Sequence, residues 1–124
     1  RVLGPAHAET VVAQSSLATI LCRQKKAEGE QVFRSLLAVV EQAALQSRYP
    51  PAYYRDRLGW CLGELGRYPE SESLLLGSYA EFSGKLGAEH AWTQLVVSHL
   101  VRLYQNWKRP AQVAAWQAKV VTKK

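Results

Sequence analysis

An octapeptide at the start of the chain returns in its second half. LGPAHAET occupies residues 3–10 and LGAEHAWT occupies residues 86–93, so Leu, Gly, His, Ala and Thr recur at the same spacing 83 residues later. That interval is nearly twice the roughly 40 residues of a two-helix repeat. The octapeptide therefore predicts an internal period, which constrains the architecture more than any single residue does.

Apolar residues recur at helical spacing in six blocks, which short polar or Pro/Gly breaks separate. In the second block, Val32, Phe33, Leu36, Leu37 and Val40 fall on one face of a helix. No stretch alternates apolar and polar residues with the β-branched enrichment of a strand. We therefore expect an all-α protein with helices at about 8–23, 27–42, 51–65, 69–83, 91–106 and 110–122.

The six blocks superpose as three pairs, at intervals of 41 and 42 residues. Leu17, Leu58 and Leu100 align in the first helix of each pair, and we expect all three to pack inward. The aligned residues of the second helices are Gly29, Ser71 and Gln112, followed four residues later by Phe33, Leu75 and Trp116. Three helix-turn-helix units, at about 3–43, 44–85 and 86–122, thus account for a single domain.

Proline and glycine mark several helix ends. Gly66 is placed to close the third helix in a left-handed conformation, and Lys25 and Lys108 occupy the equivalent turns. A proline suits the first turn of a helix, where its missing N–H has no intrahelical partner to lose. The prolines that fall there are Pro51, Pro69 and Pro110.

The stretch Leu58-Gly59-x-x-Leu62-x-x-x-Gly66-x-Tyr68-x-x-Ser71-x-x-x-Leu75 resembles the tetratricopeptide repeat. The period near 42 with LGxxHxxT ahead of the first helix is similar to the longer kinesin-light-chain-type variant. The segment LVRLYQNWKRPAQVAAWQAKV also resembles the last repeat of the arrays that follow the kinase domain in bacterial serine/threonine kinases. The middle unit departs from the pattern, because LQSRYPPAYY replaces the octapeptide.

The resemblance implies a right-handed superhelix of three antiparallel helix pairs. It also implies a protein–protein interaction scaffold, in which the first helices line a concave groove that binds a peptide or a partner protein. A structural, self-associating repeat segment without a peptide ligand, or the regulatory region of a kinase, is the alternative. Self-association would use exposed repeat ends at Val11 or at Val120 and Val121.

Helical spacing selects the residues that should face the groove. Arg57, Trp60 and Arg102 are the preferred contacts, because a Trp can anchor an apolar side chain while guanidinium groups hold carboxylates. Alternatively, Trp60 packs in the groove wall and the arginines pair with Asp56 and Glu64 on their own helix. The peptide-binding lysine, asparagine and arginine rows of the family are missing here, so the ligand class is not inherited. The expected groove residues are Ser15, Ser16, Thr19, Arg23, Tyr53, Asp56, Arg57, Trp60, Glu64, Ser98, His99, Arg102 and Gln105, with Val12 and Leu95 beside them.

Other chemistry is not expected. The chain lacks a nucleophile elbow, a phosphate-binding Gly loop and an HExxH helix, which argues against an enzyme or a cofactor. His7 and His90 lie far apart and should serve the starts of first helices with Thr10 and Thr93, rather than bind metal. Cys22 and Cys61 lack CxxC spacing and lie in apolar helix-like runs, so we expect buried free thiols.

The net charge of +6 is spread along the chain, which is typical of solvated helix faces rather than of a nucleic-acid interface. An acidic peptide or protein is the partner that this charge would favour, and steep salt dependence would mark nucleic-acid or membrane binding instead. No apolar run is long enough for a membrane span or a secretory signal, so we expect a cytoplasmic location. Because Arg1 opens the chain and Met is missing, we expect a fragment of a larger protein.

Overall fold

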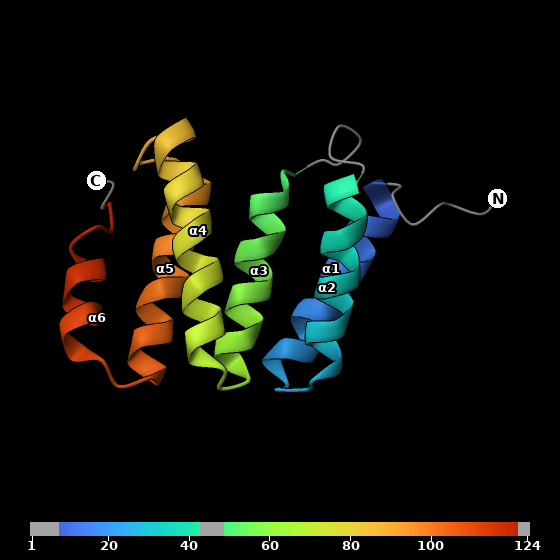
Figure 1. Ribbon diagram of the computed structural model, residues 1–124, viewed down its shortest axis with the longest axis horizontal. Coiled ribbons are helices and arrows are strands. Elements are labelled where there is room, and N and C mark those ends of the chain that lie inside the picture. The colour runs from blue at the N-terminus through green and yellow to red at the C-terminus, as the bar shows by residue number, and fades with distance from the viewer. Residues whose placement is uncertain (1–7, 43–48, 122–124) are drawn as a thin grey trace.

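The computed structural model describes residues 8–42 and 49–121, and these residues form helices without a strand (Figure 1). This confirms the all-α prediction. Five of the six helices begin and end within three residues of the expected positions. The helices are α1 (Ala8–Arg23), α2 (Glu28–Gln42), α3 (Pro51–Glu64), α4 (Tyr68–Leu86), α5 (Ala91–Asn106) and α6 (Pro110–Gln117).

The exception is α6, which ends at Gln117 instead of residue 122. The side chain of Gln94 explains the early end, because it takes up two backbone groups beyond the helix. Its amide nitrogen donates to the Lys119 carbonyl at 3.1 Å, and its oxygen accepts from the Val121 N–H at 2.9 Å. The chain therefore turns back toward α5 instead of continuing the helix.

The three turns inside the helix pairs have the same construction. Lys25 and Lys108 have φ values of 60° and Gly66 has a φ value of 85°, so each turn contains one left-handed residue. The N–H of the following residue donates at 2.9 Å to the carbonyl five residues back in each turn. This shared pattern supports the register of 41 and 42 residues derived from the sequence.

Helix starts also follow the sequence. Pro51, Pro69 and Pro110 lie in first turns as predicted. His90 precedes α5, and its Nδ1 accepts a hydrogen bond from the Trp92 N–H at 3.0 Å. The structural role predicted for this histidine is thus confirmed, whereas His7 lies outside the described residues.

The helices pack in two layers. Each helix contacts the next one along the chain, and α3 also contacts both α1 and α5. The first helices of the pairs therefore line up as one layer, and α2, α4 and α6 follow the other side of the row in Figure 1. Small residues allow the two helices of a pair to approach. A Cβ on Gly29 of α2 would lie 2.6 Å from Cys22 Sγ of α1.

Buried apolar side chains form two clusters, and each spans two helix pairs. The first joins α1, α2 and α3 and contains Phe33 and Leu58, while the second joins α3, α4 and α5 and contains Leu75 and Leu100. The first helices α3 and α5 thus each pack against the preceding pair, which buries their apolar faces.

The prediction that Leu17 packs inward is wrong. Leu17 is 51% exposed, whereas Leu58 and Leu100, at the same position in later pairs, are 1% and 0% exposed. The described residues provide no helix pair before α1, so the surface that covers Leu58 and Leu100 has no counterpart here. Ala18 takes the inward position instead. The expected exposed end at Val11 is also wrong because Val11 is buried, although Val120 is exposed.

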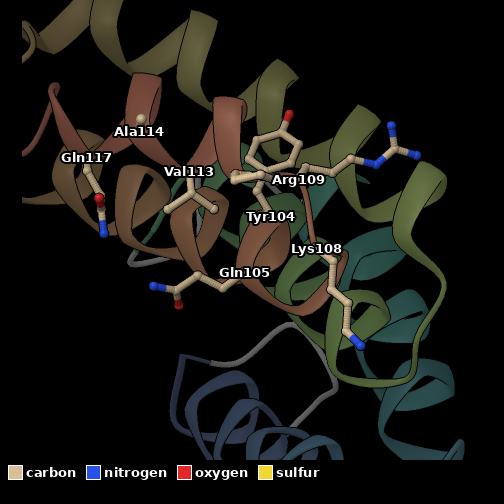
Figure 2. Close-up of a pocket in the computed structure, with 8 residues that line it drawn as sticks. Tyr104, Gln105, Lys108, Arg109, Val113, Ala114 and Gln117 are labelled. Carbon is tan, nitrogen blue, oxygen red and sulfur yellow. The ribbon is translucent and has the colours of Figure 1, made fainter.

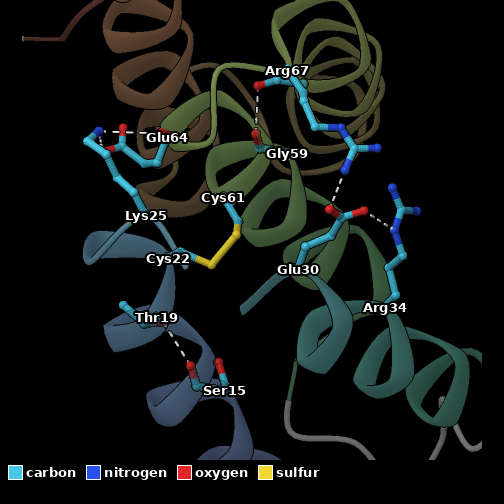
Figure 3. The surroundings of a disulfide bond; sticks show 11 residues. Ser15, Thr19, Cys22, Lys25, Glu30, Arg34, Gly59, Cys61, Glu64 and Arg67 are labelled. Carbon is cyan, nitrogen blue, oxygen red and sulfur yellow. Dashed lines mark hydrogen bonds and ion pairs between the residues drawn. A yellow bond between two sulfur atoms is a disulfide. The ribbon is translucent and has the colours of Figure 1, made fainter. Parts of the chain in front are cut away.

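The prediction of free thiols is wrong as well, because Cys22 and Cys61 form a disulfide (Figure 3). The two Cα atoms lie 5.2 Å apart, within the usual range for a disulfide. Sequence spacing could not reveal this pairing, since α1 and α3 meet only through the tertiary fold. The disulfide joins the first two helix pairs covalently.

No helix within residues 8–42 and 49–121 combines the length and the apolar character that a bilayer span needs.

Candidate functional site

A cavity of about 480 Å³ opens along the layer of first helices, where α1, α3 and α5 each contribute side chains. Seven of its eight lining residues belong to the groove set expected from the sequence, and the eighth, Leu95, was placed beside it. The lining residues are Thr19 and Arg23 from α1, Arg57, Trp60 and Glu64 from α3, and Leu95, His99 and Arg102 from α5.

A second, smaller cavity of about 170 Å³ continues toward the start of α3. Arg57 lines both cavities, so the two meet at its side chain. Three tyrosines give the smaller cavity an aromatic wall. It is lined by Val12, Ser15, Ser16, Tyr49, Tyr53, Tyr54 and Arg57.

Arg57 differs from the other arginines of α3 and α5 because it pairs with no carboxylate of the described residues. Its guanidinium carbon lies 5.6 Å from the centre of the Tyr53 ring, and its buried Nε has no hydrogen-bond partner. Arg55 and Arg102, in contrast, reach glutamate oxygens at 2.8 and 2.6 Å. The groove therefore offers a cation that no described carboxylate neutralises.

Arg102 and Lys25 neutralise Glu64 at one end of the larger cavity. Arg102 binds the Glu64 carboxylate through two hydrogen bonds of 2.6 and 2.9 Å. Lys25 donates to the Glu64 backbone carbonyl at 3.3 Å (Figure 3). The hydrogen bonds from Arg102 hold the pKa of the Glu64 carboxyl below its ordinary value. Glu64 is thus a buried, neutralised part of the wall, and its pairing with Arg102 occurs between helices.

Asp56 and His99 form a second contact between α3 and α5, below the groove. Asp56 is fully buried, and its Oδ1 lies 2.9 Å from His99 Nδ1. The centre of the His99 ring lies 6.2 Å from that of Trp60, so the two rings are neighbours in the cavity wall. His99 faces the cavity, while Asp56 supports it from below and is not itself a lining residue.

Three of the predicted groove residues do not line either cavity. Asp56 is buried, Ser98 is exposed and donates to the Leu95 carbonyl of its own helix, and Gln105 lines a different hollow. Helical spacing alone could not separate these residues from the positions beside them that line the cavities. Sequence reasoning missed Tyr49 and Tyr54, which the aromatic segment RYPPAYY could have indicated.

A separate hollow of about 450 Å³ lies between α5 and α6 (Figure 2). Its floor is largely apolar, and two cations, Lys108 and Arg109, lie at its edge. The lining residues are Tyr104, Gln105, Lys108, Arg109, Pro110, Val113, Ala114 and Gln117.

Among the described residues, no three His, Cys, Asp or Glu side chains come together in a cluster that could bind a metal ion. No family model matches the chain, and the searches found no similar curated protein or solved structure.

Proposed function

We propose that this domain is a protein–protein interaction scaffold of the tetratricopeptide type, which binds an extended peptide segment of a partner in the groove along α1, α3 and α5. The single observation that carries this proposal is the pair of cavities that meet at Arg57. The repeated turns support a superhelix of three equivalent helix pairs, in which first helices line the inner surface.

The charge and polarity of the groove favour a ligand with at least one acidic side chain. Arg23 and Arg57 line the larger cavity without a described carboxylate partner, while Glu64 and Asp56 have cationic or imidazole partners. Arginine binds carboxylates through a planar fork of donors, and Trp60 offers apolar surface beside it. The expected ligand combines an acidic residue with apolar or aromatic neighbours.

A library of displayed linear peptides, selected on the oxidised domain, provides the ligand for the test. Arg57→Gln should weaken binding of the selected peptides about tenfold or more, which corresponds to roughly 1.4 kcal/mol. Ser16→Trp, at an exposed groove position, should block the smaller cavity by bulk. Fluorescence anisotropy measures both changes.

Matched controls lie outside the groove. Arg109→Gln removes an arginine that lies over the Trp107 ring and also lacks a described carboxylate partner. Ser73→Trp adds the same bulk at an exposed position of α4. Both controls should bind the selected peptides like the unmodified domain. Equal binding by the groove variants and the controls would exclude the groove as the binding site.

The compartment is a further part of the proposal. Disulfides persist in oxidising compartments and are rare in the reducing cytoplasm. The Cys22–Cys61 disulfide therefore favours an extracytoplasmic setting over the cytoplasmic one expected from the sequence. Alkylation of the protein in its own cells before lysis should label neither cysteine, and labelling of both would contradict this setting.

Self-association is a second candidate function, and one observation favours it. Leu17 and Ile20 of α1 are each 51% exposed on the same side of the row. Sedimentation equilibrium over a concentration series should then reveal dimers, which Leu17→Glu abolishes. A constant monomer mass would remove this candidate.

A further inference from the structure

The hollow between α5 and α6 corresponds to the grooves of the two preceding helix pairs, and each of those grooves already holds a helix of the molecule. α3 packs against α1 and α2, and α5 packs against α3 and α4. In each case a helix lies in the groove that the preceding pair leaves open. Within the described residues, the α5–α6 pair is followed by no such helix, and its groove is the 450 Å³ hollow of Figure 2.

Lys25 shows what a turn lysine does when the next helix is present. Its Nζ donates to the carbonyl of Glu64 at 3.3 Å and lies 4.0 Å from the Glu64 carboxylate. Glu64 is the last residue of α3, so the ammonium group meets the negative end of the helix dipole. The turn lysine thus marks where the C-terminal end of the next helix lies.

Lys108 occupies the same position in the last turn, with the same φ value of 60°. The backbone hydrogen bonds also agree, since Lys26 donates to Leu21 and Arg109 donates to Tyr104, both at 2.9 Å. Yet Lys108 has no carboxylate or carbonyl partner in the described part of the chain. Its ammonium group can therefore pair with a ligand in the hollow, which Lys108 borders.

Arg109 repeats this contrast one residue later. Its counterpart in the preceding pair, Arg67, binds the carboxylates of Glu30 and Glu70. Arg109 instead lies over the Trp107 ring, 4.5 Å from its centre, and has no acidic partner among the described residues. The edge of the hollow therefore carries two positive charges, Lys108 and Arg109. Their counterparts in the earlier turns, Lys25 and Arg67, both pair with carboxylates.

We propose that the hollow binds an amphipathic α-helix of a partner protein, with the C-terminal end of that helix at Lys108. The apolar side of the helix would fill the floor formed by Tyr104, Pro110, Val113 and Ala114. A carboxylate in its last turn would pair with Lys108, as Glu64 does with Lys25. This site is independent of the peptide groove.

A second copy of this chain does not fit the charge of the site. The exposed apolar face of α1 would be the natural insert, since Leu17 aligns with Leu58 and Leu100. However, α1 ends at Arg23 and is followed by Lys25 and Lys26, so its C-terminal end would bring positive charge to Lys108 and Arg109. The partner helix must instead be acidic at that end.

A library of lactam-stabilised 14-residue helices provides the probe. Four positions spaced i, i+3, i+4 and i+7 vary among apolar residues, and one position in the last turn varies among Glu, Gln and Lys. Selection on the unmodified domain should enrich Glu in the last turn. Ala114→Trp, which fills the hollow from an exposed position, should weaken the selected helices at least tenfold in Kd.

Lys108→Gly tests the charge without endangering the fold, because glycine adopts a positive φ more readily than lysine does. It should weaken Glu-bearing helices about threefold to tenfold, and it should weaken their Gln counterparts less, since those lose only the contact of Lys108 with the end of the helix. Ala115→Trp, on an exposed position of α6 outside the hollow, is the matched control for bulk.

Three results would overturn the proposal. They are the failure of any helix to bind, equal binding to Ala114→Trp and Ala115→Trp, and selection without enrichment of Glu. Dimers that depend on Ala114 would identify a second copy as the occupant and would also contradict it. Peptides that bind the groove should be insensitive to Ala114→Trp, so failure here and failure of the groove proposal are distinguishable.

Discussion

Where α3 meets the first helix pair, a disulfide joins the two sides beside exposed ion pairs. Where α5 meets the second pair, part-buried hydrogen bonds, the Arg102–Glu64 ion pair and aromatic packing join them instead. Cys22 and Cys61 form the covalent link of the first junction. The second junction has none, and its links include Tyr104 to Glu72 at 2.7 Å and His99 to Asp56 at 2.9 Å. The same contact between a first helix and the preceding pair is thus stabilised by a covalent bond at the first junction and by noncovalent contacts alone at the second.

The two junctions differ because their helices bury different amounts of apolar surface. The outer side of α1 is open, and its apolar residues Leu17 and Ile20 remain half exposed. α3 is covered on both sides, and nine of its residues are buried. A disulfide compensates for the smaller burial of α1, since cross-linking restricts the unfolded chain without needing more buried surface.

The largest expected effect comes from the leucines of the first helices. Leu58→Ala should lower the free energy of unfolding by about 2–5 kcal/mol, because it leaves a cavity in a closed core. Leu17→Ala should change it by less than about 0.5 kcal/mol, since Leu17 is half exposed. Urea denaturation of both variants checks the pair. Equal losses would contradict the placement of α1.

The disulfide should give the next largest effect, confined to the first junction. The double variant Cys22→Ser/Cys61→Ser should lose about 2–4 kcal/mol of stability, as expected for a loop of this length. Hydrogen exchange should locate the loss in α1, while α5 keeps its protection. Unchanged stability under oxidising conditions would mean that the disulfide does not form in solution.

Replacement of Gly29 by alanine tests the close packing of α1 against α2. Gly29→Ala should cost about 1–3 kcal/mol, because its Cβ would lie 2.6 Å from Cys22 Sγ and 2.9 Å from the Cys22 nitrogen. Gly77→Ala in α4 is the control, since its Cβ meets no atom within 4 Å. That control should stabilise the protein by up to about 1 kcal/mol through helix propensity. Thermal unfolding compares the two, and a harmless Gly29→Ala would contradict the close approach of α1 and α2.

The smallest effect is a pH dependence at the second junction. Burial, assisted by the hydrogen bond to Glu72, raises the pKa of the Tyr104 phenol above its ordinary value. A raised pKa in the folded state means that this contribution to stability is complete below pH about 10 and is lost as the pH rises further. Tyr104→Phe should therefore reduce the alkaline loss of stability, measured by urea denaturation from pH 9 to 11. An identical slope in the variant would contradict this.

Much of the fold could be predicted from the sequence because local rules govern it. Apolar spacing, prolines in first turns and the register of Lys25, Gly66 and Lys108 gave the helices and their pairing. The disulfide and the exposure of Leu17 could not be predicted, since both depend on which helices meet and on which helix has no neighbour.

The groove was predictable in part for the same reason. Helical spacing brought Arg57, Trp60 and His99 to one side, and they line one cavity. Spacing could not show that Asp56 lies beneath them or that the arginine that pairs with Glu64 comes from another helix, because those facts depend on distances between helices. Sequence period therefore locates the face of a helix, and tertiary contacts decide which residues on that face are available.

The most direct test of the groove is a two-dimensional NMR titration of the domain with a peptide selected from the linear library. We expect the indole N–H resonance of Trp60 and the backbone amide resonances of Thr19 and His99 to shift together and saturate at a common Kd, while the indole resonance of Trp116 stays in place. Shifts confined to α2 and α4, with Trp60 unmoved, would contradict this expectation.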